Sequence, residues 1–515
     1  MARWFHPVDR DQGCLLPADA RSWLPADHLA WQVIGVVGEL DLSRFAAACR
    51  ADRQGQAPYD PAMMAGLLLY CYVKGIRSSR KIAGACVDDL GCVVICGGAR
   101  PSHQAVARFI GRHRCEVRRL FVQVLSLLAA GGAVGGQIAA VDGSPVSASA
   151  SRYANLTGEQ LATSVAAAEA AIGAEVEAWL DGAAAAGQAG QQPLWDGDDD
   201  DGLPGGGGGR RLAALTAKLA RLHAAQAKLA ERQAAAGKNS PRARVRAAEQ
   251  AVEGAAARLA RAEAAQAAKM DRYQRQLAAG KAWAGRKPVP AERSARVAIV
   301  RGRLESAQAR LQAARQAADA APVKVSATDP DSRLLPAKNG GWLQGWNLQL
   351  TAARRQILLA VALHDNPADV GALEQMITMA IANCELAGLA GRIRAWLADN
   401  GYASAASFAA LDHLMLLVAV SRETTQTGRA GDSGDTIPEG WEKMAARLAT
   451  PAGKSLYKRR ARTVEPAFAQ FFARFGRYLN YRGRDAADTE IHLLGAVHNL
   501  ARLLEHRRRC LAAAT

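Results

Sequence analysis

The chain has 515 residues and half of them are hydrophobic, which excludes a disordered protein and allows roughly two to four folded domains. Its 65 Lys and Arg outnumber its 48 Asp and Glu, and the formal net charge of +17 favours polyanionic partners, most simply nucleic acid. A basic coding bias would produce the same excess, so composition alone leaves these two interpretations even.

The nine cysteines are scattered, without the CxxC or Cys/His spacing of a zinc site. Reduced, buried thiols in the cytoplasm are the simplest interpretation. The stretch MARWFHPVDRDQG lacks the apolar core of a signal peptide, and no uncharged apolar run reaches the ~20 residues that span a bilayer. We therefore expect a cytoplasmic protein without a membrane partner.

Residues 1–132 are predicted to form an all-α domain. Asp60 and Pro61 make a good cap and first turn for an apolar helix. Two further helices are expected over 77–91 and 101–132, with a glycine-containing turn between them.

The helix over 101–132 carries a basic side. Val106, Phe109 and Ile110 are expected to form its inward face, because they share one side of a helix. That leaves Arg108, Arg112 and Arg114 available on the outside. A short helix, a turn and a basic helix resemble a helix-turn-helix, which lays its second helix in a DNA groove. An ordinary bundle with a solvated basic face is the alternative, and the total charge favours DNA binding.

Residues 133–152 contain the first predicted strand, a short apolar run in IAAVDGS that ends at Asp142. From 153 to 322 the pattern changes to an inserted helical arm with a flexible Asp- and Gly-rich linker at 195–209, which cannot form a core. Valines and leucines repeat every seven residues in this arm, which predicts a coiled-coil seam for dimerisation or DNA contact. The heptad positions are Val245, Val252 and Leu259, and then Val297, Leu304 and Leu311.

Residues 323–510 return to the period of strands and form the remainder of the predicted core. The expected elements are a hairpin over 345–353 and 356–365, a helix over 369–386, a strand over 393–399, a helix over 403–411, a strand over 414–420 and a last helical region over 455–510. This order predicts a mixed α/β layer.

Three acids occupy informative places in that layer. Asp142 and Asp399 follow apolar strands, and Glu465 lies on the final helical region. Such acids can hold a pair of Mg²⁺ ions ~3.5–4 Å apart, which serves in-line attack on a phosphodiester. Basic residues next to Glu465 would attract the DNA. Asp365 also ends a strand and is the substitute if Asp399 is wrong.

The order of elements and acids resembles the RNase H-like fold of DDE transposases. It resembles more closely the transposases of bacterial insertion sequences that have a helical N-terminal domain and a Tyr-x-x-Arg…Glu signature. The segments that carry the resemblance are VDGSPVSASASR (141–152), ATDPDSRLL (327–335), GWNLQL (345–350), LADNGYAS (397–404), YKRRARTVEPAF (457–468) and RGRDAADTEIHLLGAVHNLARLL (482–504). They extend over the chain except for the arm at 153–320.

The resemblance implies metal-dependent cleavage and joining of DNA. The family's two aspartates and its glutamate fall on Asp142, Asp399 and Glu465. Asp142 would bridge two Mg²⁺ (or Mn²⁺) ions, with one held by Asp399 and the other by Glu465. Tyr457 and Arg460 match the Tyr and Arg of the signature. The residues expected to contact DNA are Tyr457, Lys458, Arg459, Arg460, Arg462, Arg477, Arg482, Arg108 and Arg112.

Two positions near the glutamate, Pro466 and Phe472, affect how the site is predicted to be built. The signature usually carries a lysine where this chain has Phe472, so a phosphate contact is lost or is taken over by Arg474 or Arg477. Pro466 directly follows Glu465, and proline is tolerated in the first turn of a helix but breaks its interior. Glu465 is therefore expected to cap a helix or to lie at a kink.

The predicted function is that of a DNA transposase acting on the terminal inverted repeats of its own insertion sequence and on target DNA. A homodimer associated with the nucleoid is the default, because two DNA ends must be joined. The alternatives are a catalytically inert DNA-binding protein derived from such an enzyme, and a metal-dependent nuclease that does not transfer strands.

Overall fold

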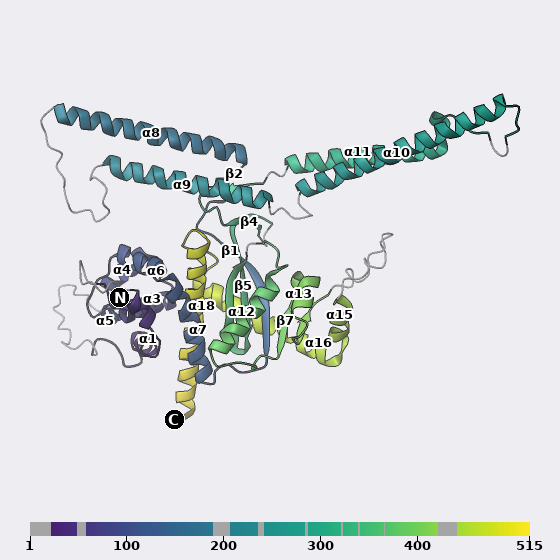
Figure 1. Ribbon diagram of the computed structural model, residues 1–515. Helices are drawn as coiled ribbons and strands as arrows, with labels where there is room; N and C mark the ends of the chain where they lie inside the picture. The colour runs from purple at the N-terminus through teal and green to yellow at the C-terminus, as the bar shows by residue number, and fades with distance from the viewer. Residues whose placement is uncertain are drawn as a thin grey trace, which may run out of the picture. The chain divides into compact units, whose positions relative to one another are not determined.

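The structure is a computed structural model that describes residues 22–48, 58–188, 207–234, 241–283, 287–320, 323–337, 340–364, 366–420 and 440–514. Most of the predicted linker at 195–209 and Asp365 lie outside these residues. Two compact units make up the chain, one formed by 1–152 with 331–515 and the other by 153–330 (Figure 1).

The first unit begins with a helical region, as predicted. Its helices are α1 (Leu29–Gly38), α2 (Ser43–Ala47), α3 (Pro61–Val73), α4 (Ser79–Asp88), α5 (Leu90–Ile95), α6 (His103–Arg112) and α7 (Arg114–Ala130). The caps are local and follow the sequence: Asp60 accepts a hydrogen bond from the backbone N–H of Met63 at 2.8 Å, and Ser102 accepts one from Ala105 at 3.2 Å.

Two predicted helices in this region are each divided in the structure. Asp89 ends α4 and caps α5 by accepting the N–H groups of Gly91 and Cys92 at 2.8 and 3.2 Å. The connection between α4 and α6 is therefore longer than the predicted turn. His113 separates α6 from α7, where it is buried with its ring against those of Phe45 and Phe109.

A mixed sheet follows, with β1 (Ile138–Ser147) at its centre. β1 pairs antiparallel with β5 (Trp342–Ala353) and parallel with β7 (Ala395–Ala398), and β7 pairs parallel with β8 (Leu416–Val418). On its other edge, β5 pairs antiparallel with β4 (Arg333–Pro336) and β6 (Leu358–His364). The predicted mixed α/β class is confirmed.

Helices bury this sheet. They are α12 (Ala372–Leu386), α13 (Ala405–Ala410), α15 (Trp441–Ala449), α16 (Pro451–Tyr457), α17 (Arg459–Phe475) and α18 (Arg484–Ala514). α17 packs on β1 and β5, whereas α12 and α18 both pack on β6. Ten consecutive residues of β5, 344–353, are buried, as expected for a strand covered on both faces.

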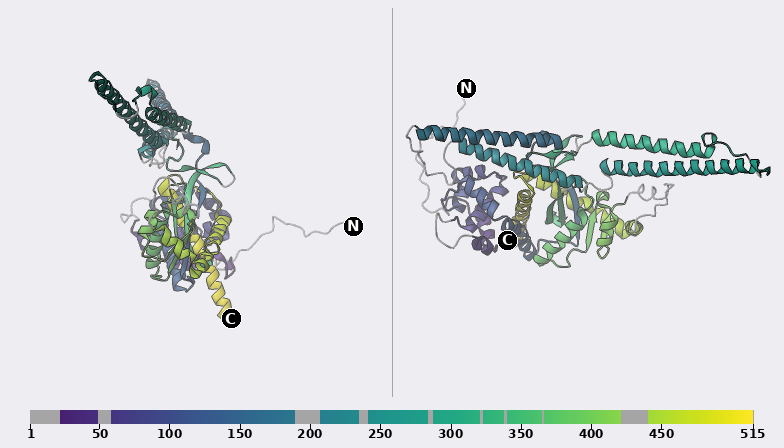
Figure 2. Two further views of the ribbon diagram at one scale, coloured as in Figure 1. Left: turned by 90° about the vertical axis from the view of Figure 1, so that its right-hand side faces the viewer. Right: turned by 45° about the horizontal axis from the view of Figure 1, so that its top comes forward.

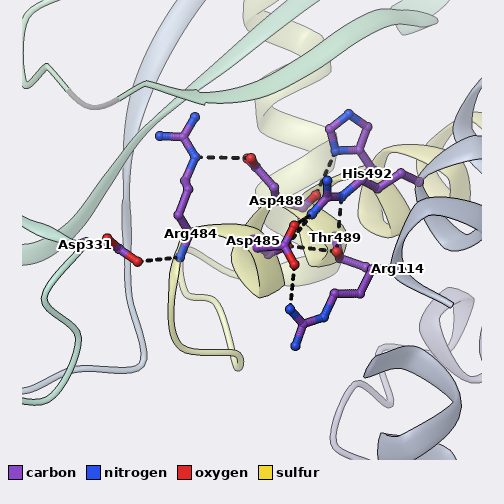
Figure 3. A network of polar contacts seen from close by, with 8 residues as sticks. Arg114, Asp331, Arg484, Asp485, Asp488, Thr489 and His492 are labelled. Carbon is purple, nitrogen blue, oxygen red and sulfur yellow. Dashed lines mark hydrogen bonds and ion pairs between the residues drawn. The ribbon is translucent and has the colours of Figure 1, made fainter. Parts of the chain in front are cut away.

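Polar contacts join α18 to the N-terminal helices (Figure 3). Arg114 forms an ion pair with Asp485 at 2.5 Å, and Arg118 donates to Thr489 at 3.1 Å and pairs with Asp485. Arg114, expected to be free on the outside of its helix, is thus used within the fold. At the first residue of α18, the backbone N–H of Arg484 donates a hydrogen bond to Asp331 at 3.0 Å.

The second unit contains two pairs of long helices. Its helices are α8 (Gly158–Gln188), α9 (Gly207–Ala234), α10 (Pro241–Ala278) and α11 (Ala295–Ala320), and its strands β2 (Asn155–Leu156) and β3 (Val325–Ser326) are antiparallel. Figure 2 shows α10 and α11 lying side by side. Ion pairs of 2.9 Å join Glu263 to Arg301 and Glu249 to Arg315, so the two helices run antiparallel. Val297 is buried between them, and the other five heptad residues are half-buried.

Short 3₁₀ turns lie at η2 (Arg152–Ala154), η3 (Ala291–Arg293), η4 (Arg354–Gln356) and η5 (Asn400–Tyr402). Within the described ranges, none of the helices combines the length and the apolar character that crossing a membrane requires.

Candidate active site

Asp142 and Asp399 lie at the same edge of the parallel strand pair. The pairing of β1 with β7 ends where Ala140 faces Leu397. Asp142 follows two residues later within β1, and Asp399 follows two residues later, directly after the end of β7. The prediction that the first strand ends at Asp142 is wrong, because β1 continues to Ser147 through its antiparallel pairing with β5. Asp142 therefore lies within a strand that is paired on one side only at this point.

The Asp142 carboxylate is half-buried and has two partners. One oxygen accepts the backbone N–H of Gly143 at 2.9 Å, and the other lies 3.4 Å from Nη1 of Arg460. Burial raises the pKa of Asp142 above its ordinary value, and the nearby charges of Asp399 and Asp369 raise the pKa further, whereas Arg460 and the Gly143 N–H oppose the shift. The site thus contains clustered negative charge that a single arginine compensates in part.

Asp399 is held by the turn that it begins. Its carboxylate accepts the backbone N–H of Gly401 at 2.9 Å, so it caps the turn η5. Tyr402, the last residue of that turn, is completely buried and anchors it in the core. The turn fixes Asp399 close enough to Asp142 for the two charges to interact.

Glu465 lies on α17 and is exposed to solvent. Of its two expected positions, that of a helix cap is wrong, since α17 starts at Arg459 and continues through Pro466 to Phe475, and that of a kink stays a prediction. A proline cannot donate to the carbonyl four residues earlier, here that of Arg462, but Arg462 is exposed and water can serve instead. Phenylalanines on the other face of α17 are buried and fix the helix on the sheet. They are Phe468, Phe471 and Phe475.

Arg460 connects the three predicted acids. Burial works against its charge, yet the pKa of Arg460 is raised above its ordinary value because the charges of Asp142, Asp399 and Glu465 act on it. In the part of the chain that the structure describes, no three acidic, histidine or cysteine side chains come together closely enough to hold a metal ion. Among these acids, Asp142 is the one that forms an ion pair with Arg460 within the described residues.

Asp369 is a fourth acid at this site, and it is not among the residues predicted from the sequence. It lies between β6 and α12, and its Oδ1 accepts hydrogen bonds from Asn347 at 2.9 Å and Gln349 at 2.8 Å. The signal was available in β5, where Asn347 and Gln349 interrupt an apolar run at a spacing of two and so lie on one face. Buried amides need polar partners, and Asp369 supplies one.

The predicted DNA-contacting residues of α16 and α17 line the surface around the site. Tyr457 is half-buried, and burial raises its pKa. Lys458, Arg459 and Arg462 are exposed. Arg459 also lines a hollow of 790 Å³ at the amino ends of β1 and β7, together with Arg392 and Arg394, and no acidic side chain is among the described residues that line it.

The two arginines proposed as substitutes for the missing lysine differ in position. Arg477 donates to the Ser144 hydroxyl on β1 at 2.9 Å, and its guanidinium lies 3.9 Å from the ring centre of Phe472. Arg474 instead has a buried Nη1 without a hydrogen-bond partner, and burial lowers its pKa. Arg477 is thus close to the strand that carries Asp142.

The remaining predicted DNA-contacting residues lie elsewhere in the first unit. Arg482 donates to the Ser149 carbonyl at 2.8 Å. Arg108 and Arg112 are exposed on α6, which packs against α4. Their guanidinium groups are accessible to a ligand.

Two comparisons with protein families bear on the class of protein. Residues 18–112 match a family described as a transposase domain (DUF772), and residues 434–504 match a family described as a transposase DDE domain. No curated protein and no solved structure matches the chain. The family matches indicate a transposase, and they confirm the resemblance to the DDE transposases of insertion elements. Glu465 lies inside the second match, whereas Asp142 and Asp399 lie outside both.

Proposed function

We propose that this transposase is catalytically active and that it cleaves and joins DNA at the ends of its own insertion sequence. The observation that carries the proposal is the ion pair between Arg460 on α17 and Asp142 on β1, at 3.4 Å. The charges of Asp399 and Glu465 also raise the pKa of Arg460, which is consistent with all three acids belonging to one site. Acids that lie close together repel one another, and a bound cation would offset this repulsion. Such clusters are therefore typical of functional sites.

The core that carries these acids is proposed to be RNase H-like. Three antiparallel strands, β6, β5 and β1, continue into the parallel strands β7 and β8. Asp142 lies on the first strand of the order that the resemblance implies, Asp399 directly follows the fourth strand, and Glu465 lies on a later helix. The remaining parts are proposed to be a DNA-binding domain at 1–132 and an inserted arm at 153–322.

The carboxylates suit hard divalent cations, which prefer oxygen ligands. We infer that Asp142, Asp399 and Glu465 would hold two Mg²⁺ or Mn²⁺ ions, with Asp142 as the ligand that both ions would share. When bound, such ions lower the pKa of an attacking water or 3′-hydroxyl and stabilise the leaving oxygen. Arg460 has a long side chain on the first turn of α17, so it can turn from Asp142 towards a DNA phosphate when cations replace it.

DNA is the proposed partner because the basic residues gather on both sides of the acids. The residues proposed to contact the terminal inverted repeat are Arg108 and Arg112. Those proposed to contact the cleaved end are Tyr457, Lys458, Arg460, Arg462, Arg477 and Arg482. The hollow with Arg459, Arg392 and Arg394 starts at Ile138, four residues before Asp142. Four residues of a strand extend over ~13 Å at ~3.3 Å per residue. Along one DNA strand this distance corresponds to about four nucleotides, so a DNA backbone bound at the acids could continue to the hollow. A homodimer acting at the nucleoid would bring both ends together.

Strand cleavage and joining with a DNA fragment that carries the element's ends test the proposal. The wild-type protein is expected to cleave in the presence of Mg²⁺ and to produce joined products, and Asp142→Asn, Asp399→Asn and Glu465→Gln are expected to bind the DNA without cleaving it. Specific binding by an inactive wild-type protein would favour the inert DNA-binding alternative. Cleavage without joined products would favour a nuclease.

A further inference from the structure

Asp369 is fixed in a single orientation by the sheet beneath it. Both amides that donate to its Oδ1, those of Asn347 and Gln349, are buried on the same face of β5. Asp369 also lies before α12, but its side chain does not cap that helix, because the N-cap is Gly371 and no side chain accepts a hydrogen bond there. The carboxylate is therefore directed to the active site and not to the helix.

The contact continues from Asp369 to the turn that carries Asp399. The Oε1 atom of Gln349 accepts a hydrogen bond from the hydroxyl of Tyr402, the last residue of that turn. A glutamine amide has one acceptor and one donor end, so the bond from Tyr402 directs its NH₂ group to Asp369. The two hydrogen bonds thus run in the same direction, from Tyr402 to Gln349 and from Gln349 to Asp369.

The Asp369 carboxylate also lies against two glycines beside the predicted catalytic acids. A Cβ added to Gly143, which follows Asp142, would lie 2.2 Å from Oδ1 of Asp369. A Cβ added to Gly401 would lie 3.3 Å from Oδ2 of Asp369. Glycine permits the close approach of a backbone to another group. One carboxylate therefore separates the backbone segments that carry Asp142 and Asp399.

We propose that Asp369 is a positioning residue that sets the separation of Asp142 and Asp399. Its Oδ1 is held by β5 and lies against Gly143, and its Oδ2 lies against Gly401, so it acts as a spacer between the two segments. Its hydrogen bond to Gln349, which in turn binds Tyr402, holds the segment that carries Asp399 in a fixed position relative to the segment that carries Asp142. This inference rests on the proposed function, in which the two aspartates bind the same ion.

The test compares three variants of the full-length chain. Asp369→Ala removes the spacer, and we expect cleavage kcat and Mn²⁺ affinity to fall about 10- to 100-fold, the usual effect of losing a residue that orients metal ligands. The DNA KM is expected to remain unchanged. Asp369→Asn keeps the size and one acceptor oxygen, and is expected to restore kcat to within about threefold of the wild-type value. Asp412→Ala is the matched control, because Asp412 is an exposed acid paired with Lys443.

Wild-type kcat and Mn²⁺ affinity in Asp369→Ala would overturn the proposal. Equal losses in Asp369→Asn and Asp369→Ala would also overturn it, since charge and not position would then matter. If Asp369→Ala does not fold, Tyr402→Phe decides: loss of kcat with intact DNA binding supports the proposal, and wild-type kcat contradicts it. Mn²⁺ titration followed by electron paramagnetic resonance separates this inference from the proposed function, because it gives a result even if the wild-type protein cleaves no DNA.

Discussion

Nη1 of Arg460 lies 3.4 Å from Oδ2 of Asp142, although 318 positions separate the two residues in the sequence. Both side chains are about one-fifth exposed, at 18% and 20%, so the pair is partly screened from solvent. The contact joins the signature on α17 to the central strand β1. It also gives Arg460 two successive partners in the proposed mechanism, the carboxylate before cations bind and a DNA phosphate afterwards.

Replacement of Arg477 tests whether it has taken over the role of the lysine that Phe472 replaces. Loss of a hydrogen bond to a charged phosphate costs about 1.5–3 kcal/mol, so Arg477→Ala is expected to lower kcat/KM for DNA cleavage about 10- to 100-fold. Phe472→Lys added to Arg477→Ala is expected to recover part of this loss. An unchanged rate in Arg477→Ala, measured with the same DNA substrate, would contradict the assignment.

Arg108 and Arg112 give a prediction about salt dependence. If both contact phosphates, the double substitution by alanine lowers DNA affinity, and the slope of log K against log salt becomes shallower by about two, roughly one for each contact. Fluorescence anisotropy between low and moderate salt measures the slope. Arg507→Ala serves as the control, because Arg507 is paired with Glu39 on another surface. Equal slopes for all three proteins would argue against DNA contact by α6.

The buried pair of Arg77 and Glu490 is expected to hold the N-terminal helices on the core. Arg77 donates to Glu490 at 2.6 Å and to the Tyr478 carbonyl at 2.7 Å, and both side chains are almost completely buried. Glu490→Gln leaves the arginine charge without its partner, so the free energy of unfolding is expected to fall by about 3–5 kcal/mol. Glu39→Gln, at the exposed pair with Arg507, is expected to change it by less than about 1 kcal/mol. Equal effects in a urea titration would refute this difference.

His498 gives a pH dependence of stability. Burial lowers its pKa to about 4, and its Nε2 lies 2.8 Å from the Gln356 carbonyl, so the neutral ring donates there. The unfolded chain has a pKa of about 6.5 at this residue and binds the proton more tightly, so the free energy of unfolding falls by about 1.4 kcal/mol per pH unit below 6.5, until about pH 4. Wild-type protein should lose about 2 kcal/mol between pH 7 and pH 5 from this residue. Urea titrations of His498→Gln should lack that loss, and an identical pH dependence would contradict the account.

Local signals in the sequence predicted much of the fold. The caps at Asp60 and Ser102 depend on neighbouring residues. Polar and apolar residues alternate in β5, and β7 is a short apolar run, so these features could be found without tertiary information. The continuation of β1 beyond Asp142 could not, because GSPVS becomes a strand only through pairing with β5. The continuation of α17 through Pro466 is also seen only in the folded chain, where α17 packs on β1 and β5.

The site was predicted less completely for the same reason. Asp142 and Asp399 end apolar runs, which is a local pattern, and the structure brings them together at one sheet edge. Asp369 is distinguished only by its partners Asn347 and Gln349, and these partners depend on how β5 and the segment before α12 meet. The contact of Arg460 with Asp142 similarly needs the tertiary fold.

The central claim is that Asp142, Asp399 and Glu465 bind the same pair of divalent ions. Anomalous diffraction from crystals of the full-length protein with Mn²⁺ and DNA carrying the element's ends tests it most directly. The account predicts two manganese peaks, both within bonding distance of Asp142, with Asp399 on one and Glu465 on the other. Manganese bound elsewhere, or Arg460 still paired with Asp142 at saturating Mn²⁺, would contradict it.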